Sequence, residues 1–78
     1  MPSPFYTKLV DTVAVYTGKE KALGAIERQL KHCPNDAEKF GPADLKAILT
    51  YVTSATKLYV ADAAKRDEMI GKITGLAA

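Results

Sequence analysis

The chain has 78 residues, of which 47% are hydrophobic, and its formal net charge is +2. This length allows one domain, here residues 1–78, and the hydrophobic fraction favours a folded chain over a disordered one. The small net charge argues against nucleic acid or an anionic membrane as the main partner.

Cys33 is the only cysteine and His32 the only histidine. An intrachain disulfide is therefore excluded. A zinc site would need carboxylates, or residues of a second chain, as its further ligands. No metal or cofactor is therefore expected. Lys8 and Asp11 interrupt the apolar stretch that a secretory signal needs, and no apolar run is long enough to span a membrane. A lone cysteine suits a reducing compartment, and the expected location is the cytoplasm.

The first half of the chain predicts two helices, over about residues 4–16 and 19–33. Ser3 is a typical N-cap residue, and Pro4 fits the first helical position, where its missing N–H costs nothing. Helical spacing places apolar residues on one face of each helix. These residues are Phe5, Leu9, Val10, Val13 and Tyr16 in the first helix, with Tyr6 off the main stripe, and Leu23, Ile26, Leu30 and Cys33 in the second.

Local signals set the ends of these two helices. Gly18 can end the first one because glycine tolerates a positive φ. Thr17 and Glu20 have the spacing of a capping box for the second. Pro34 disfavours helix at Cys33, so the second helix should stop there.

Residues 34–41 form the longest connector. Asp36 can cap a single turn within it, and Phe40 is expected to fold back onto the core. Gly41 and Pro42 then restart a helix by the same proline rule.

The helix predicted over residues 42–60 has two apolar stripes. One stripe holds Leu45, Ile48, Leu49, Val52, Ala55, Tyr59 and Val60. The second holds Ala47, Tyr51 and Leu58. Together they cover more than half of the circumference, which is wider than a surface helix needs. Such a helix is either central to the fold or buried on two sides, one of them against another chain.

Residues 42–74 form either one long helix or two. A single helix would place Arg66 and Asp67 inside the apolar stripe, so we favour a break with Asp62 as a new N-cap. The last helix then covers about residues 63–74, with Met69, Ile70 and Ile73 on its apolar face and Gly75 at its end. Three acid–base pairs are spaced as surface ion pairs: Glu27–Lys31, Asp62–Arg66 and Glu68–Lys72.

The predicted fold class is therefore all-α, a compact bundle of three to four short helices. A β-hairpin within residues 48–60 is the competing prediction, since Ile, Thr, Tyr and Val suit strands. Its turn would fall at residues 53–56, which contain no Gly, Asn or Asp to form it.

His32 and Cys33 are the only pair that resembles a nucleophile and its base. Neighbouring helical residues point about 100° apart, and no third group is evident to orient the histidine. Cys33 is better explained as a small core residue and His32 as a surface residue near a helix C-terminus. We therefore expect a protein that is not an enzyme.

The wide apolar surface of the 42–60 helix predicts a protein–protein interaction module, a small regulator or scaffold that associates with itself or docks on another protein. Tyrosine is enriched at such interfaces. The expected interface residues are Ala47, Tyr51, Leu58 and Tyr59. The alternative is a small helical nucleic-acid-binding protein. Its modest basic set would be Lys19, Lys21, Arg28 and Lys31.

Pro34-Asn35-Asp36, followed by a helical segment over residues 42–74, resembles the needle subunits of type III secretion systems. Those are helical hairpins of comparable length with a proline-bearing loop before a long C-terminal helix. The second proline of their loop is absent here, and Cys33 and Gly41-Pro42 also depart from the pattern. The resemblance implies a helical assembly subunit, a third functional hypothesis.

Overall fold

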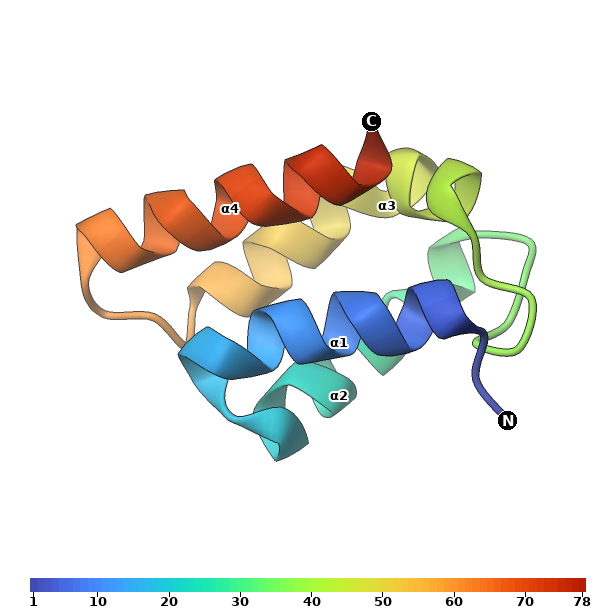
Figure 1. The fold of residues 1–78 in the computed structure, drawn as a ribbon, viewed down its shortest axis with the longest axis horizontal. Helices are drawn as coiled ribbons and strands as arrows, with labels where there is room; N and C mark the ends of the chain where they lie inside the picture. The colour runs from blue at the N-terminus through green and yellow to red at the C-terminus, as the bar shows by residue number, and fades with distance from the viewer.

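A computed structural model describes all 78 residues. It contains four α-helices, α1 (Pro4–Thr17), α2 (Lys19–Glu27), α3 (Pro42–Lys57) and α4 (Ala63–Ala77), and a short 3-10 helix, η1 (Leu30–His32) (Figure 1). The structure has no strand. The all-α prediction is therefore confirmed, and the alternative hairpin within residues 48–60 is wrong.

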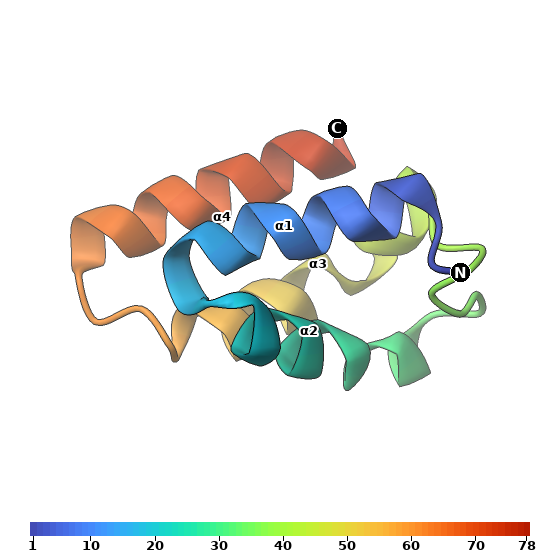
Figure 2. The same ribbon diagram turned by 60° about the horizontal axis from the view of Figure 1, so that its bottom comes forward.

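The four helices pack as a compact globule of 32 × 24 × 19 Å. α1 lies beside α2 and α4, while α3 packs against α2 and α4 and touches α1 less (Figures 1 and 2). Each helix thus has two main neighbours, and the apolar faces of all four point into the space between them. None of the helices has the length and apolar character required to cross a membrane.

One cluster of buried side chains fills this space. Its members from the helices are Tyr6, Leu9, Val10 and Val13 of α1, Ala22 and Ile26 of α2, Leu45, Ile48 and Val52 of α3, and Met69 and Ile73 of α4. Phe40 and Val60 complete the cluster from the loops. The predicted packing of the connector residue Phe40 onto the core is confirmed, since only 2% of it is exposed.

The buried face of α1 is rotated slightly from the predicted one. Tyr6, expected off the main stripe, is buried, whereas Phe5 and Tyr16 are half-buried. The reason is Phe40, whose ring meets Tyr6 edge to face at a centroid distance of 5.5 Å and is stacked with Phe5 at 6.0 Å. The connector thus adds an aromatic group that helical periodicity within α1 does not reveal.

The buried face of α2 also differs from the predicted one. Ala22 and Ala25 have no exposed surface, while Leu23, predicted for the core, is 40% exposed. Small side chains allow a helix to lie close to its neighbours. The alanine face of α2 therefore points into the core, and Leu23 lies on the outer side of the helix. Leu30 and Cys33 are half-buried at the edge of the core.

Ser3 begins α1 as predicted. Its Oγ accepts a hydrogen bond from the Tyr6 N–H at 3.1 Å and donates one to the Phe40 carbonyl at 2.6 Å. Pro4 occupies the first turn, where its missing N–H leaves no bond unmade. The cap therefore also connects the start of α1 to the end of the 34–41 connector.

Gly18 alone separates α1 from α2. Its φ of 88° is a backbone conformation that favours glycine, as predicted for the end of α1. The predicted capping box of Thr17 and Glu20 is wrong. Thr17 instead donates to the Val13 and Gly18 carbonyls, and α2 begins without a side-chain cap.

The predicted 19–33 helix is shorter than expected, because α2 ends at Glu27. The Gln29 N–H bonds to the Ile26 carbonyl at 2.9 Å, an i−3 bond, and the chain continues as η1. Pro34 accounts for the end of η1, since it disfavours the α conformation at Cys33, whose backbone is extended at φ −129° and ψ 159°.

Carboxylates organise the connector and the start of α3. As predicted, Asp36 caps a turn, with its Oδ1 accepting from the N–H groups of Glu38 and Lys39. Asp44 is buried at the first turn of α3, and its Oδ2 accepts from the Gly41 N–H at 2.9 Å. The Asn35 amide donates to both oxygens of Asp44 at 3.1 and 3.2 Å.

The break between α3 and α4 is confirmed, and it lies slightly earlier than predicted. α3 ends at Lys57 rather than at residue 60, and Asp62 caps α4 by accepting from the N–H groups of Ala64 and Lys65. α4 runs to Ala77, past the predicted end at residues 74–75. The long C-terminal helix implied by the secretion-needle resemblance is therefore absent.

Candidate functional site

The four residues predicted for an interface are all exposed. Spacings of four and seven residues place Ala47 and Tyr51 of α3 on one side with Leu58, the C-cap residue just after the helix, and Tyr59 follows Leu58. The exposed fractions are 49% for Tyr51, 80% for Leu58 and 40% for Tyr59. The second apolar stripe of the 42–60 helix thus lies at the surface, while the first contributes Leu45, Ile48 and Val52 to the core.

Tyr51 contacts η1 through His32. The two rings are stacked with centroids 3.9 Å apart and planes 6° from parallel. Both residues are exposed, so one flat aromatic pair lies at the surface between η1 and α3. This contact holds the Tyr51 ring in a defined orientation.

Tyr59 contacts α2 and the turn that follows it through two cationic side chains. The Arg28 guanidinium donates to the Tyr59 hydroxyl at 3.2 Å. The Lys21 ammonium lies 5.7 Å from the centroid of the same ring. Two positive charges are thus gathered around one tyrosine at the surface.

We call the surface formed by these two sets of residues the α2–α3 face. It consists of Lys21, Arg28 and His32 with Ala47, Tyr51, Leu58 and Tyr59. The three N-terminal members were not predicted for a protein interface: Lys21 and Arg28 belonged to the basic set of the nucleic-acid alternative, and His32 to the nucleophile–base candidate. Their spacings of seven and four residues are a helical pattern, but nothing in the sequence indicates that this side of α2 meets the tyrosines of α3.

No carboxylate is paired with the cations of this face. The one ion pair of the chain joins the N-terminal amine to Glu38 at 3.4 Å. The predicted pairs Glu27–Lys31, Asp62–Arg66 and Glu68–Lys72 do not form. Arg66 donates instead to the carbonyls of Val60 and Ala61.

The acidic residues nearest in sequence to Arg28 and Tyr59 are Glu27 and Asp62. Burial first, and the charge of Glu27 second, raise the pKa of Tyr6 on α1. Asp62 is engaged as the cap of α4. The residues of the α2–α3 face thus include two cations, Lys21 and Arg28, and no carboxylate, although the whole chain has a net charge of only +2.

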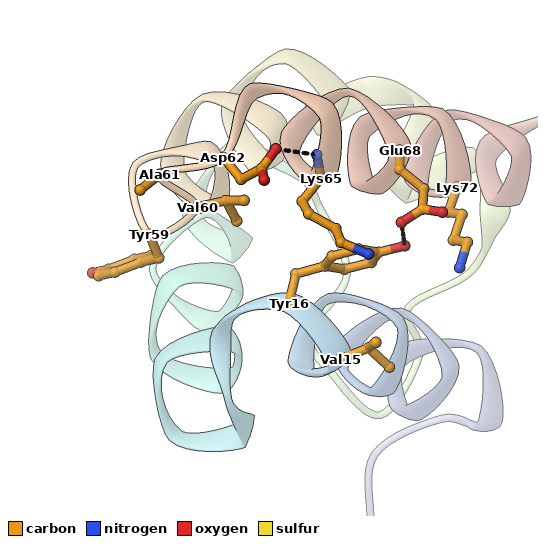
Figure 3. Close-up of a pocket in the computed structure, with 9 residues that line it drawn as sticks. All are labelled: Val15, Tyr16, Tyr59, Val60, Ala61, Asp62, Lys65, Glu68 and Lys72. Atoms are coloured by element: carbon orange, nitrogen blue, oxygen red, sulfur yellow. Dashed lines mark hydrogen bonds between the residues drawn. The ribbon is translucent and has the colours of Figure 1, made fainter.

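A shallow groove of about 460 Å³ lies between the end of α1 and the start of α4 (Figure 3). The Tyr16 hydroxyl donates to Glu68 at 2.9 Å, and the Lys72 ammonium lies 5.4 Å from the Tyr16 ring centroid. Tyr16 first, and Glu68 after it, raise the pKa of Lys72. The Tyr16–Glu68 hydrogen bond and the contact between Lys72 and the Tyr16 ring connect α1 to α4. Tyr59 points away from these three residues (Figure 3).

His32 and Cys33 do not form a nucleophile–base pair. The His32 ring is stacked on Tyr51, whereas the Cys33 sulfur lies 3.3 Å from the Asn35 carbonyl and 3.4 Å from that of Leu30. Burial first, and the charge of Asp44 second, raise the pKa of the Cys33 thiol. Cys33 therefore stays in its weakly nucleophilic thiol form at neutral pH.

The structure brings no three His, Cys, Asp or Glu side chains together in a metal-binding arrangement. Comparison of the chain with protein-family models, with curated proteins and with solved structures finds no match.

Proposed function

We propose that this protein is a non-enzymatic interaction module that binds another protein through the α2–α3 face. The observation that supports this most is the exposure of Tyr51, Leu58 and Tyr59 together on that face, while the core is filled without them. Large exposed apolar and aromatic groups gathered on one surface are typical of protein-binding sites.

The contacts between the two sides of the face also favour recognition of a protein. Tyr51 and Tyr59 are held by side chains of the α2–η1 segment, so little side-chain freedom is lost when a partner covers them. Tyrosine and arginine are the residue types that most often dominate binding energy at protein interfaces. Leu58 adds an apolar side chain that is 80% exposed.

A nucleic-acid partner has weaker support from the same geometry. Proteins that bind single strands stack bases on open aromatic faces. Here His32 covers one face of Tyr51, and Lys21 lies over the ring of Tyr59. The net charge of +2 adds little long-range attraction for phosphates.

Photo-crosslinking in the cells of origin tests the proposal. p-Benzoylphenylalanine is introduced at Leu58, and in a separate protein at Val15, a matched control that is 78% exposed on α1. We expect discrete protein adducts from position 58 that position 15 does not give. Equal labelling from both positions, or adducts that disappear on nuclease treatment, would contradict a protein-docking face at α3.

A further inference from the structure

Lys21 and Arg28 both point at Tyr59 although like charges repel. The guanidinium is 3.2 Å from the Tyr59 hydroxyl and the ammonium is 5.7 Å from its ring centroid. Neither cation has a carboxylate within ion-pair distance. An anion placed beside the tyrosine hydroxyl would neutralise both charges and accept hydrogen bonds from them.

The source of that anion is a partner of different composition rather than a second copy. None of the seven residues that define the α2–α3 face is acidic, and a two-fold contact applies the same surface to itself; Asp62 and Asp67 lie at its margin, in the hollows lined by Tyr59 and by Leu58. A second copy would therefore add two further cations to the interface and could offer carboxylates only from this margin. Charge complementarity requires a partner surface that is acidic.

The shape of α3 indicates a helix as the partner. Small and large side chains alternate along its exposed side at spacings of four, three and four residues, in the order Ala47, Tyr51, Ser54 and Leu58. Such alternation forms ridges and grooves into which the side chains of another helix fit. From residue 47 to residue 58 the stripe is about 16 Å long, or three helical turns.

We infer that the α2–α3 face binds an acidic amphipathic helix. A carboxylate of this helix binds at the Tyr59 hydroxyl between Lys21 and Arg28, and its apolar side chains cover Tyr51 and Leu58. This inference rests on the proposed function, because it assumes a protein partner and adds the chemistry of that partner.

Two synthetic peptides serve as probes of this chemistry. Both are amphipathic helices with leucines on one face; the first has glutamates on the flanking positions, and the second has lysines at the same positions. Binding to the intact protein is followed by fluorescence anisotropy. We expect the glutamate peptide to bind at least about tenfold more tightly than the lysine peptide, and to weaken as ionic strength rises from about 0.05 to about 0.5 M.

Charge reversal on the protein identifies the anion position. The double variant Lys21→Glu/Arg28→Glu should lose the glutamate peptide and gain affinity for the lysine peptide. The gain is a readout that simple unfolding cannot produce. Lys8→Glu, an exposed charge reversal on α1, is the control and should leave both affinities unchanged.

Other outcomes would overturn the inference. These are equal affinity for the two peptides, an equal effect of Lys8→Glu, or preferential binding of a single-stranded oligonucleotide probe over the glutamate peptide. If position 58 still crosslinks to a protein while the glutamate peptide fails to bind, the docking function stands and the acidic-helix inference is wrong. If position 58 gives no protein adduct, the proposed function itself fails.

Discussion

The imidazole ring of His32 lies flat against the phenol ring of Tyr51, with centroids 3.9 Å apart and planes 6° from parallel. This stack connects η1 to the exposed side of α3 at the surface of the molecule. It fixes the orientation of Tyr51 without burying it. A stacked pair of this kind provides a rigid aromatic surface of the type that partners recognise.

The stack should be measurable as a coupling between the two side chains. We expect a double-mutant cycle with His32→Ala and Tyr51→Ala to give an interaction free energy of about 0.5–1 kcal/mol, because aromatic pairs contribute this much beyond their buried area. Urea unfolding of the four proteins measures it. Tyr51→Phe retains the ring and should retain most of the coupling; complete additivity of the two alanine variants would show that the stack is energetically silent.

Leu58→Glu should leave the fold unchanged and cost at most about 1 kcal/mol. Leu58 is 80% exposed, but it is the C-cap residue of α3, where a carboxylate meets the negative end of the helix dipole and typically costs about 0.3–1 kcal/mol. Ile48→Ala, on the buried side of the same helix, should cost about 2–5 kcal/mol. Circular dichroism and urea unfolding compare the two variants. Loss of helicity in Leu58→Glu would place this stripe in the core and remove it as a docking surface.

Gly18→Ala and Gly24→Ala should have opposite effects. Gly18 has a φ of 88° and a ψ of 149°, which is reserved almost entirely for glycine, so alanine should cost about 1–3 kcal/mol there. Gly24 is helical, and a Cβ added to it meets no atom within 4 Å. Alanine at Gly24 should therefore stabilise α2 by about 0.5–1 kcal/mol. Thermal unfolding measures both, and destabilisation by Gly24→Ala would contradict the open space around it.

Cys33 should react slowly with thiol reagents and make stability depend on alkaline pH. Its pKa is raised above 9.0 by burial and by Asp44, so in the folded protein the thiol keeps its proton above the pH at which the unfolded chain loses it. The stabilisation is fully present below pH 9 and is lost as the pH rises through the folded-state pKa. Thiol labelling rates from pH 7 to 10, and unfolding curves compared with Cys33→Ala, test this. Labelling as fast as in an unfolded control peptide would contradict the raised pKa.

Asp62→Ala should weaken α4 more than the other helices. The Asp62 carboxylate accepts from the N–H groups of Ala64 and Lys65, and loss of such a cap costs about 1 kcal/mol. Hydrogen exchange should show faster opening of the first turn of α4. Asp67→Ala, an exposed residue of the same helix that does not cap it, is the control and should leave exchange unchanged.

Much of the fold follows from local chemistry. Ser3 before Pro4, the turn at Asp36, and Asp62 at the break all lie where their capping properties predict. These caps and turns can be predicted from the sequence because each involves backbone and side-chain atoms within a few residues of one another.

The choice of buried face needed the tertiary structure. Both stripes of the 42–60 helix are apolar, and periodicity alone does not say which one faces the core. Tyr6 is buried because Phe40 arrives from the connector, and Leu23 is exposed because the alanines of α2 face inwards. In each case the outcome depends on how far neighbouring helices are rotated and separated, which helical spacing does not fix.

The sequence by itself therefore determined an all-α chain, its break at Asp62, and the presence of two apolar stripes on the helix predicted over residues 42–60, one of them formed by Ala47, Tyr51 and Leu58. Only the tertiary structure placed His32 against Tyr51 and brought Lys21 and Arg28 together at Tyr59. The physical reason is range. Caps and periodicity act within a few residues, whereas the contacts of the α2–α3 face join side chains that are 19 (His32–Tyr51), 31 (Arg28–Tyr59) and 38 (Lys21–Tyr59) positions apart.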